Sequence, residues 1–232
     1  MDIFSQYLDP RVTLEERLRH AFDRLLIPDN ERAILTAFLE PLRSKSPVTR
    51  AHYEHSIRVA LLARHIAQFM HLNEKPAFTA GLMHDIGKCQ VDLGTLGKTE
   101  GWTEADTEAI KAHVIDGYRF LRNCLDFTAE IVVLHHRFQK GDYPDELPPH
   151  LHNYSEETKA MIALYGRILA LADTYDALHR VNDKFGACTT LSGEEIKEKM
   201  IELNIDQHRL ISQLYDIGIF TTALIAEKSI SQ

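Results

Sequence analysis

The sequence predicts an all-α protein, and three observations support this class. The chain of 232 residues contains only 8 Pro and 11 Gly, which favours helices over turn-rich β structure. Hydrophobic residues at 44% and charged residues at 26% are ordinary for globular proteins, so disordered and fibrous classes are excluded. Apolar residues recur at helical spacing in one segment after another, and no convincing series of strands interrupts them.

Two helices are expected in the first part of the chain. Thr13–Glu16 forms a capping-box pattern, and it opens a segment with apolar residues at helical spacing. A second helix is expected over Asp29–Leu42, and Ser44–Pro47 has the composition of a linker. We therefore expect a short N-terminal helical extension over residues 1–46 and the main domain over residues 47–232.

The main domain is expected to contain several helices separated by short loops. The expected helical segments begin at Thr49, run from about Pro76 to Gly87, begin at Thr103, run from about Thr128 to His136, and run from Ser155 to Val181. One or two further helices are expected to close the chain. Loops are expected after Gly87 as far as Gly101, and over Lys140–His152, which contains three prolines.

Composition also limits the function. The formal charge is −8, from 26 Lys and Arg against 34 Asp and Glu, and without a basic cluster we expect no binding to DNA or RNA polymers. No apolar run reaches the ~18 residues of a membrane span, and the first residues lack the features of a secretory signal. Cys89, Cys124 and Cys188 are too widely spaced for a cysteine metal site. We expect a cytoplasmic protein without membrane contact.

The 13 histidines are unusual in this composition, and several follow or interrupt apolar helical segments. The polar residues in such positions are His55, His84 with Asp85, His135 with His136, and Asp173. Buried ionisable groups cost free energy unless they are paired or bind metal. Separate apolar helices that each carry such a group therefore predict convergence on one polar centre.

Imidazole nitrogen and carboxylate oxygen are suitable ligands for iron, manganese, cobalt, nickel or zinc. An aspartate beside a histidine can bridge two cations, and cations about 3.5–4 Å apart can share a hydroxide and clamp a phosphate for in-line attack. Lys88, three residues after Asp85, would bring a positive charge to that phosphate. These residues predict metal-assisted hydrolysis of a phosphate ester.

The order of these motifs resembles the HD-domain metal-dependent phosphohydrolases, and in particular their HD-GYP branch. The matching elements are His55, His84–Lys88, Lys111–His113 with Gly117, His135-His136 followed by Gly141–Pro144, and Leu171–Leu178. The resemblance covers about residues 50–185 and implies an HD-domain helical bundle. Members of this branch hydrolyse cyclic di-GMP at an iron or manganese centre.

The resemblance implies two metal sites that share one carboxylate. The implied ligands are His55, His84, Asp85 and Asp173 for one metal, and Asp85, His113, His135 and His136 for the other. Asp85 would bridge two divalent ions, iron or manganese first, and a hydroxide between them would attack phosphorus. Lys88 would be the catalytic cation and would contact the substrate, a small nucleotide. Tyr143 would also bind that substrate.

Two departures from the family pattern leave alternatives open. The HD-GYP consensus after the paired histidines is Glu-Arg-x-Asp-Gly-x-Gly-Tyr-Pro, whereas residues 137–144 are one residue shorter and lack the Glu, the Arg and the Asp. Ala51 replaces the glutamate of three-metal members, which favours two metals. The second hypothesis is a signalling or binding module without robust turnover, acting through a second copy or a signalling partner. An HD-type diiron oxygenase is the third. His52 and His65 lack partner motifs and are expected at the surface.

Overall fold

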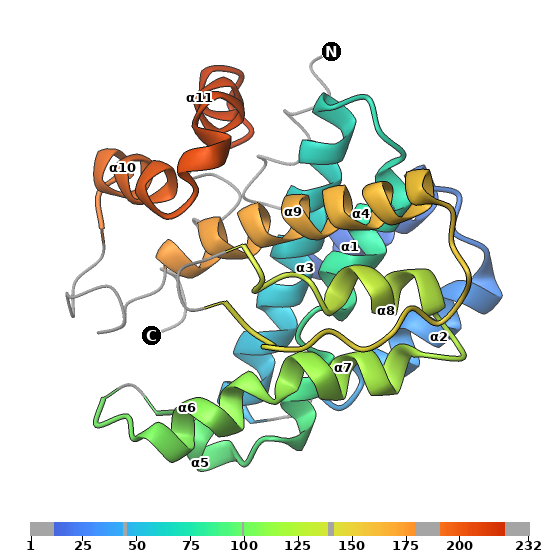
Figure 1. Cartoon of the computed structure of the whole chain (residues 1–232), viewed down its shortest axis with the longest axis vertical. Coiled ribbons are helices and arrows are strands. Elements are labelled where there is room, and N and C mark those ends of the chain that lie inside the picture. The colour runs from blue at the N-terminus through green and yellow to red at the C-terminus, as the bar shows by residue number, and fades with distance from the viewer. Residues whose placement is uncertain (1–11, 44–45, 99, 139–141, 180–190, 221–232) are drawn as a thin grey trace.

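The computed structural model describes residues 12–43, 46–98, 100–138, 142–179 and 191–220. Every regular element in these ranges is a helix, which confirms the predicted all-α class (Figure 1). The α-helices are α1 (Leu14–Arg24), α2 (Asp29–Leu39), α3 (Pro47–Phe69), α4 (Glu74–Met83), α5 (Leu93–Leu96), α6 (Glu104–Lys111), α7 (His113–Leu121), α8 (Asp126–Val132), α9 (Glu156–Leu178), α10 (Gly193–Leu203) and α11 (His208–Asp216). Two 3₁₀ helices, η1 (Ile86–Gln90) and η3 (Ile205–Gln207), lie between them.

The two 23-residue helices α3 and α9 form the centre of the molecule. Helix α4 packs along α3, and α8 packs against both α4 and α9 (Figure 1). The close approach of α3 and α4 requires Gly81, because a Cβ there would collide with the backbone of Ala60. Side chains are buried along most of α3 and α9, so polar residues on these helices lie within the core.

Helices α1 and α2 lie against this centre and contact α3 and α4 respectively. The predicted capping box of α1 is present, with Thr13 accepting from the backbone of Glu16 and Glu16 accepting in return. Phe22 and Leu35 belong to the same buried apolar cluster as residues of α3 and α4. The division of the chain at residue 46 stays a prediction.

Several predicted boundaries were wrong. Helix α3 begins at Pro47 and not at Thr49, because a proline in the first turn has the φ of a helix and lacks only an N–H that would be unpaired. The α-helical part of the next segment ends at Met83, and the chain continues past His84 and Asp85 into η1. The expected loop before Gly101 contains α5.

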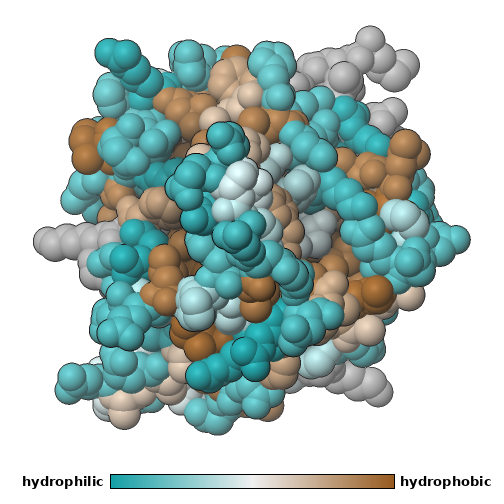
Figure 2. Space-filling view, turned by 45° about the vertical axis from the view of Figure 1, so that its right-hand side comes forward, coloured by the Kyte–Doolittle hydropathy of each residue, from teal (hydrophilic) through white to brown (hydrophobic). Residues whose placement is uncertain are grey.

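The C-terminal helices are held to the centre by a buried polar contact. Arg167 of α9 donates to Asn204 Oδ1 at 2.9 Å and to Asp206 Oδ1 at 2.6 Å, which joins α9 to the α10–α11 segment. No helix in the described ranges is both long enough and apolar enough to cross a membrane. On the face in Figure 2, hydrophobic residues stand in small groups among hydrophilic ones.

Candidate metal centre

All the predicted metal ligands come together, two from within the long central helices and the others from the ends and turns of shorter helices. His55 and Asp173 project from α3 and α9, and His113 is the first residue of α7. The two adjacent pairs occupy turns: His84 and Asp85 join α4 to η1, and His135 and His136 follow α8. Turns allow adjacent residues to face one centre, whereas neighbours within an α-helix point in different directions.

The first ligand group consists of His55, His84 and Asp85, whose ligand atoms all lie within 4.8 Å of one another. His55 Nε2 is 3.1 Å from His84 Nε2, and Asp85 Oδ2 is 3.5 Å from each of these nitrogens. Asp173 completes the set, with Oδ1 3.1 Å from His55 Nε2. The geometry therefore contains two imidazoles and two carboxylates, the predicted set.

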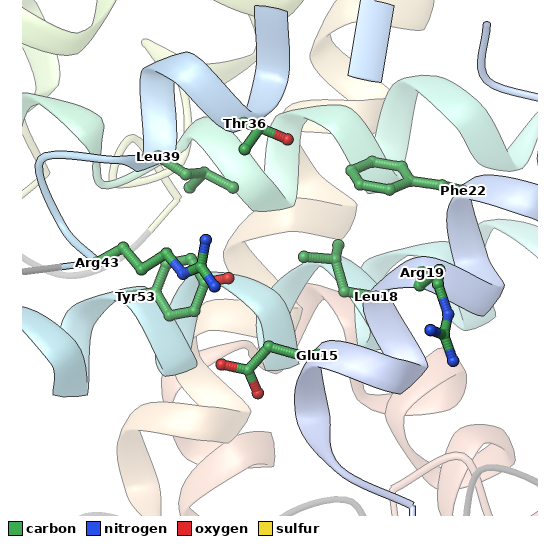
Figure 3. A pocket seen from close by; sticks show the side chains of 8 residues that line it. All are labelled: Glu15, Leu18, Arg19, Phe22, Thr36, Leu39, Arg43 and Tyr53. Carbon is green, nitrogen blue, oxygen red and sulfur yellow. The ribbon is translucent and has the colours of Figure 1, made fainter. Parts of the chain in front are cut away.

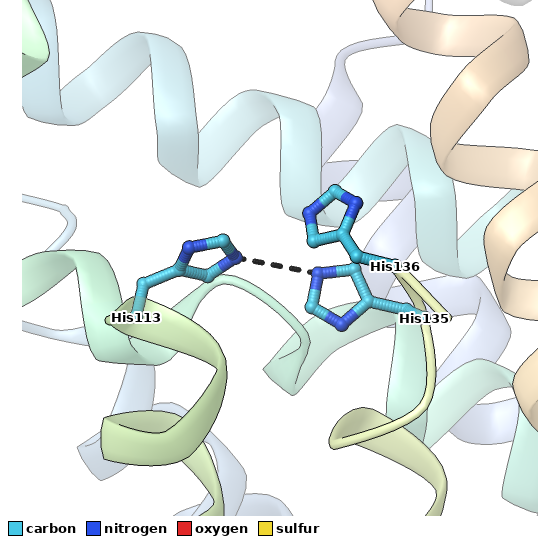
Figure 4. A group of neighbouring side chains, drawn as sticks. All are labelled: His113, His135 and His136. Atoms are coloured by element: carbon cyan, nitrogen blue, oxygen red, sulfur yellow. Dashed lines mark hydrogen bonds between the residues drawn. The ribbon is translucent and has the colours of Figure 1, made fainter. Parts of the chain in front are cut away.

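The second ligand group consists of His113, His135 and His136, again with ligand atoms within 4.8 Å of one another (Figure 4). His113 Nε2 is 3.3 Å from His135 Nε2, and the rings of His135 and His136 are 4.0 Å apart. Asp85 joins this group to the first, because its Oδ1 is 3.4 Å from His113 Nε2 while its Oδ2 faces His55 and His84.

Backbone contacts fix the tautomers of three of the histidines. His84, His113 and His135 each donate an Nδ1–H to the carbonyl oxygen three residues earlier, at 2.5 to 2.8 Å. A neutral imidazole with a proton on Nδ1 has a lone pair on Nε2. The Nε2 atoms of His113 and His135 therefore face each other at 3.3 Å with no hydrogen between them.

The second group stays neutral around neutral pH. Burial lowers the pKa of His113 to about 3, with the Lys88 ammonium acting in the same direction. Burial and the charge of His84 lower the pKa of His135 to about 4. Two facing lone pairs repel each other, and a cation between them removes that repulsion. This part of the site therefore fits a bound metal ion.

The first group carries an excess of negative charge. Burial alone would raise the pKa of Asp85, but the charges of His84 and Lys88 outweigh burial and hold this pKa well below its usual value. For His84, burial alone would lower the pKa. The negative charges of Asp85 and Asp173 outweigh burial, so the pKa of His84 is raised. The buried Asp85 Oδ1 accepts no hydrogen bond in the described part of the chain. A divalent ion would neutralise the carboxylates of Asp85 and Asp173 more fully than the single extra proton on His84 does.

Asp176 and Arg58 extend the first group, and sequence reasoning missed their role. His55 Nδ1 donates to Asp176 Oδ2 at 2.6 Å, and Arg58 Nε donates to Asp176 Oδ1 at 2.6 Å. A carboxylate behind a metal-binding imidazole fixes its tautomer and orientation. A signal was available, because Asp176 lies three residues after Asp173 and Arg58 three residues after His55, on the same helix faces.

The expectation that His52 and His65 lie at the surface was wrong. The His52 side chain is 13% exposed, and its Nδ1 is 3.8 Å from Asp85 Oδ2. His52 is one turn before His55, so helical spacing could have placed it at the centre. His65 is 2% exposed, and burial together with the charge of Arg64 lowers its pKa to about 3.

The two residues predicted to contact substrate also lie at this centre. Lys88 Nζ is 2.6 Å from Asp85 Oδ2, and the Lys88 side chain is 12% exposed. The Tyr143 ring stacks on His136 with centroids 4.4 Å apart and planes inclined by 25°. Gly141, which belongs to the same sequence motif as Tyr143, lies outside the described residues.

Replacing Asp176 with asparagine is expected to weaken the first metal site selectively. The loss of the carboxylate charge makes His55 a poorer ligand, and loss of such a contact typically lowers metal affinity by about 10- to 100-fold. A metal titration should therefore show one site weakened and one unchanged. Asp206→Asn is the matched control, because Asp206 also binds an arginine, Arg167, away from the ligand groups. Equal weakening of both sites, or of neither, would contradict this role of Asp176.

A separate pocket lies between α1, α2 and α3 (Figure 3). Its lining residues are Glu15, Leu18, Arg19, Phe22, Thr36, Leu39, Arg43 and Tyr53. None of these belongs to either ligand group, and the pocket lacks histidine and aspartate. Because the chemistry requires those ligands, the candidate active centre is at the two ligand groups and not at this pocket.

The helical fold and the buried His and Asp groups define the class to which the protein belongs. Residues 52–178 match the model of the HD domain family, and the chain belongs to that family. The fold agrees with a solved structure of the HD domain of the Listeria monocytogenes phosphodiesterase PgpH, with a TM-score of 0.51 and 20% identity over 82% of this chain and 95% of that one.

Curated relatives of the chain act on cyclic dinucleotides. It is 27% identical over 207 residues to a cyclic di-GMP phosphodiesterase of Pseudomonas aeruginosa, a match that covers 72% of this chain and 47% of the relative. It is 28% identical over 193 residues to 3'3'-cGAMP-specific phosphodiesterase 1 of Vibrio cholerae, covering 78% of this chain and 40% of the relative. The chain thus spans less than half the length of these relatives.

Proposed function

We propose that this protein is a metal-dependent phosphodiesterase that hydrolyses a cyclic dinucleotide, with cyclic di-GMP as the first candidate. The observation that carries the proposal is the position of Asp85. Its buried carboxylate directs one oxygen towards each ligand group, and Lys88 contacts it directly. The activities of the curated relatives support the substrate class.

The proposed centre would hold two divalent ions, with iron or manganese favoured and zinc, nickel or cobalt compatible with the same donors. His55, His84 and Asp173 would hold one ion, and the second ligand group would hold the other, with Asp85 shared. Bound there, the ions would lower the pKa of a water molecule and neutralise phosphate oxygens.

The protein's own residues position the reacting groups and supply further positive charge. Lys88 would exchange its contact with Asp85 for a phosphate oxygen and stabilise the charge that develops on it. Asp176 holds His55 in the orientation that directs Nε2 towards the centre. Tyr143 covers His136 and presents an aromatic surface beside the second group, where a base or ribose would pack.

Elemental analysis of anaerobically purified protein, followed by hydrolysis assays on the same sample, tests the proposal. We expect two metal ions per chain and a linear dinucleotide product from cyclic di-GMP, 3'3'-cGAMP or cyclic di-AMP. Two bound metals without hydrolysis of these substrates or of bis(p-nitrophenyl) phosphate would favour the binding module instead. Protein that turns over substrate after complete removal of metal would contradict the proposed chemistry.

A further inference from the structure

Besides Arg58, which binds Asp176, three cations contact a ligand residue, Tyr143 or the residues on either side of Tyr143, and they differ in what holds them. Lys88 is bound to Asp85 at 2.6 Å. Arg137 donates to the carbonyl oxygen of Pro144 at 2.7 Å and pairs with Asp142 at 3.2 Å, so it is engaged in holding the loop backbone. The third, Lys111, forms its ion pair at the surface, with Glu108.

Lys111 lies at the rim of the centre. It is the last residue of α6, two positions before His113, and its Nζ lies 5.9 Å from the centroid of the Tyr143 ring. A cation near an aromatic face is weakly attracted to it. Because Tyr143 in turn stacks on His136, a continuous set of contacts links Lys111 to the second ligand group.

The Lys111 ammonium is charged and available to a ligand. Its hydrogen bond and ion pair join it to Glu108 at 2.9 Å. The Lys111 side chain is 38% exposed and that of Glu108 is 65% exposed. Exposed ion pairs of this kind contribute little and exchange readily, so a phosphate could displace the Glu108 carboxylate.

We propose that Lys111 is a specificity-determining residue that binds the second, non-scissile phosphate of a cyclic dinucleotide. This inference rests on the proposed function. A cyclic dinucleotide carries two phosphodiesters in one ring, and when one lies at the ligand groups the other must lie elsewhere on the protein. A substrate that extends across Tyr143 reaches Lys111, and a charged lysine suits a phosphate as a point charge.

The test compares substrates with one and two phosphates in metal-loaded protein. In Lys111→Gln, the KM for the cyclic dinucleotide should rise about tenfold more than the KM for bis(p-nitrophenyl) phosphate, since one charge-assisted contact is worth about a factor of ten or more. Lys111→Arg should restore most of the affinity, because the arginine keeps the charge at this position. Metal content, measured in each variant, should stay at two ions per chain.

Lys159→Gln is the matched control. Lys159 pairs with Glu156 at the same spacing, at 2.7 Å, and is 37% exposed, but it lies about 21 Å along α9 from Asp173 at 1.5 Å per residue. If Lys111→Gln and Lys159→Gln have the same KM for the cyclic dinucleotide, the role of Lys111 is overturned, while the proposed function still stands. An equal rise in KM for both substrates would also overturn it, as a general structural effect. Wild-type protein that carries both metals and neither binds nor hydrolyses a cyclic dinucleotide would overturn the proposed function itself.

Discussion

Asp85→Asn is expected to remove both bound metals and to lower kcat by at least about a thousandfold. This decrease in kcat is larger than the one that follows the loss of a single contact to the transition state. The reason is the shared position of this carboxylate, whose two oxygens face different ligand groups. An asparagine keeps the size of the side chain but loses the negative charge and one of the two acceptor oxygens. Elemental analysis and turnover on one sample provide the measurement.

Asp23→Asn is the control for this variant. Asp23 is a surface aspartate of α1 that pairs with Arg32 at 2.7 Å and has a side chain 59% exposed, so its loss should change neither metal content nor kcat. The Asp85 variant also loses the favourable contacts of this carboxylate with Lys88 and His84, so circular dichroism of the metal-free variant checks that it remains folded. Full metal content in Asp85→Asn would contradict the shared-ligand arrangement.

Gly87→Ala is expected to remove the second metal while the first stays bound. Gly87 lies in η1, and a Cβ there would overlap the carbonyl oxygen of His113 and lie 2.7 Å from the backbone nitrogen of Gly117. Both of these are backbone atoms of α7, so the helix itself must move away from η1. His113 would move with it, away from His135, and the ligand distances of the second group would no longer be kept.

Metal stoichiometry measures this effect directly, with an expected change from two ions to one. Overpacking of this kind also lowers the free energy of unfolding by about 1–3 kcal/mol, measured by thermal or denaturant unfolding. Gly193→Ala is the control, since a Cβ on Gly193, in the first turn of α10, would meet nothing within 4 Å. A Gly87→Ala protein that bound two metals with wild-type affinity would show that α7 is not fixed by this contact.

The sequence indicated most of the side chains that the structure brings together, because these residues follow or interrupt an apolar run, whereas His113 was indicated by the family resemblance alone. That they bind metal stays a prediction. His84 with Asp85, and His135 with His136, mark points where a buried helix ends on polar residues, and such points must converge if their charges are to be compensated. The all-α class was equally accessible from the spacing of apolar residues. The two-metal stoichiometry and the role of Lys88 stay predictions.

The remaining features depend on packing, which a pattern of residue types does not reveal. His65 looked like a surface residue because its neighbours gave no motif, yet α3 is covered by other helices on most of its faces and buries it. Asp176 looked like one more polar residue after Asp173, and only its contact with His55 assigns its role. The need for Gly87 arises from the approach of α7, which is distant in sequence.

The backbone contacts of His84, His113 and His135 have a consequence for how metal enters the site. Each ring is tethered to a carbonyl of its own turn, so its orientation is set by helix geometry and does not await the ion. Little side-chain entropy is then lost on loading. Metal uptake should therefore be fast, with a small heat-capacity change, and one metal should replace another without any refolding of the chain. The identity of the resident ion would follow the supply of metals around the protein more than any selection by the rings.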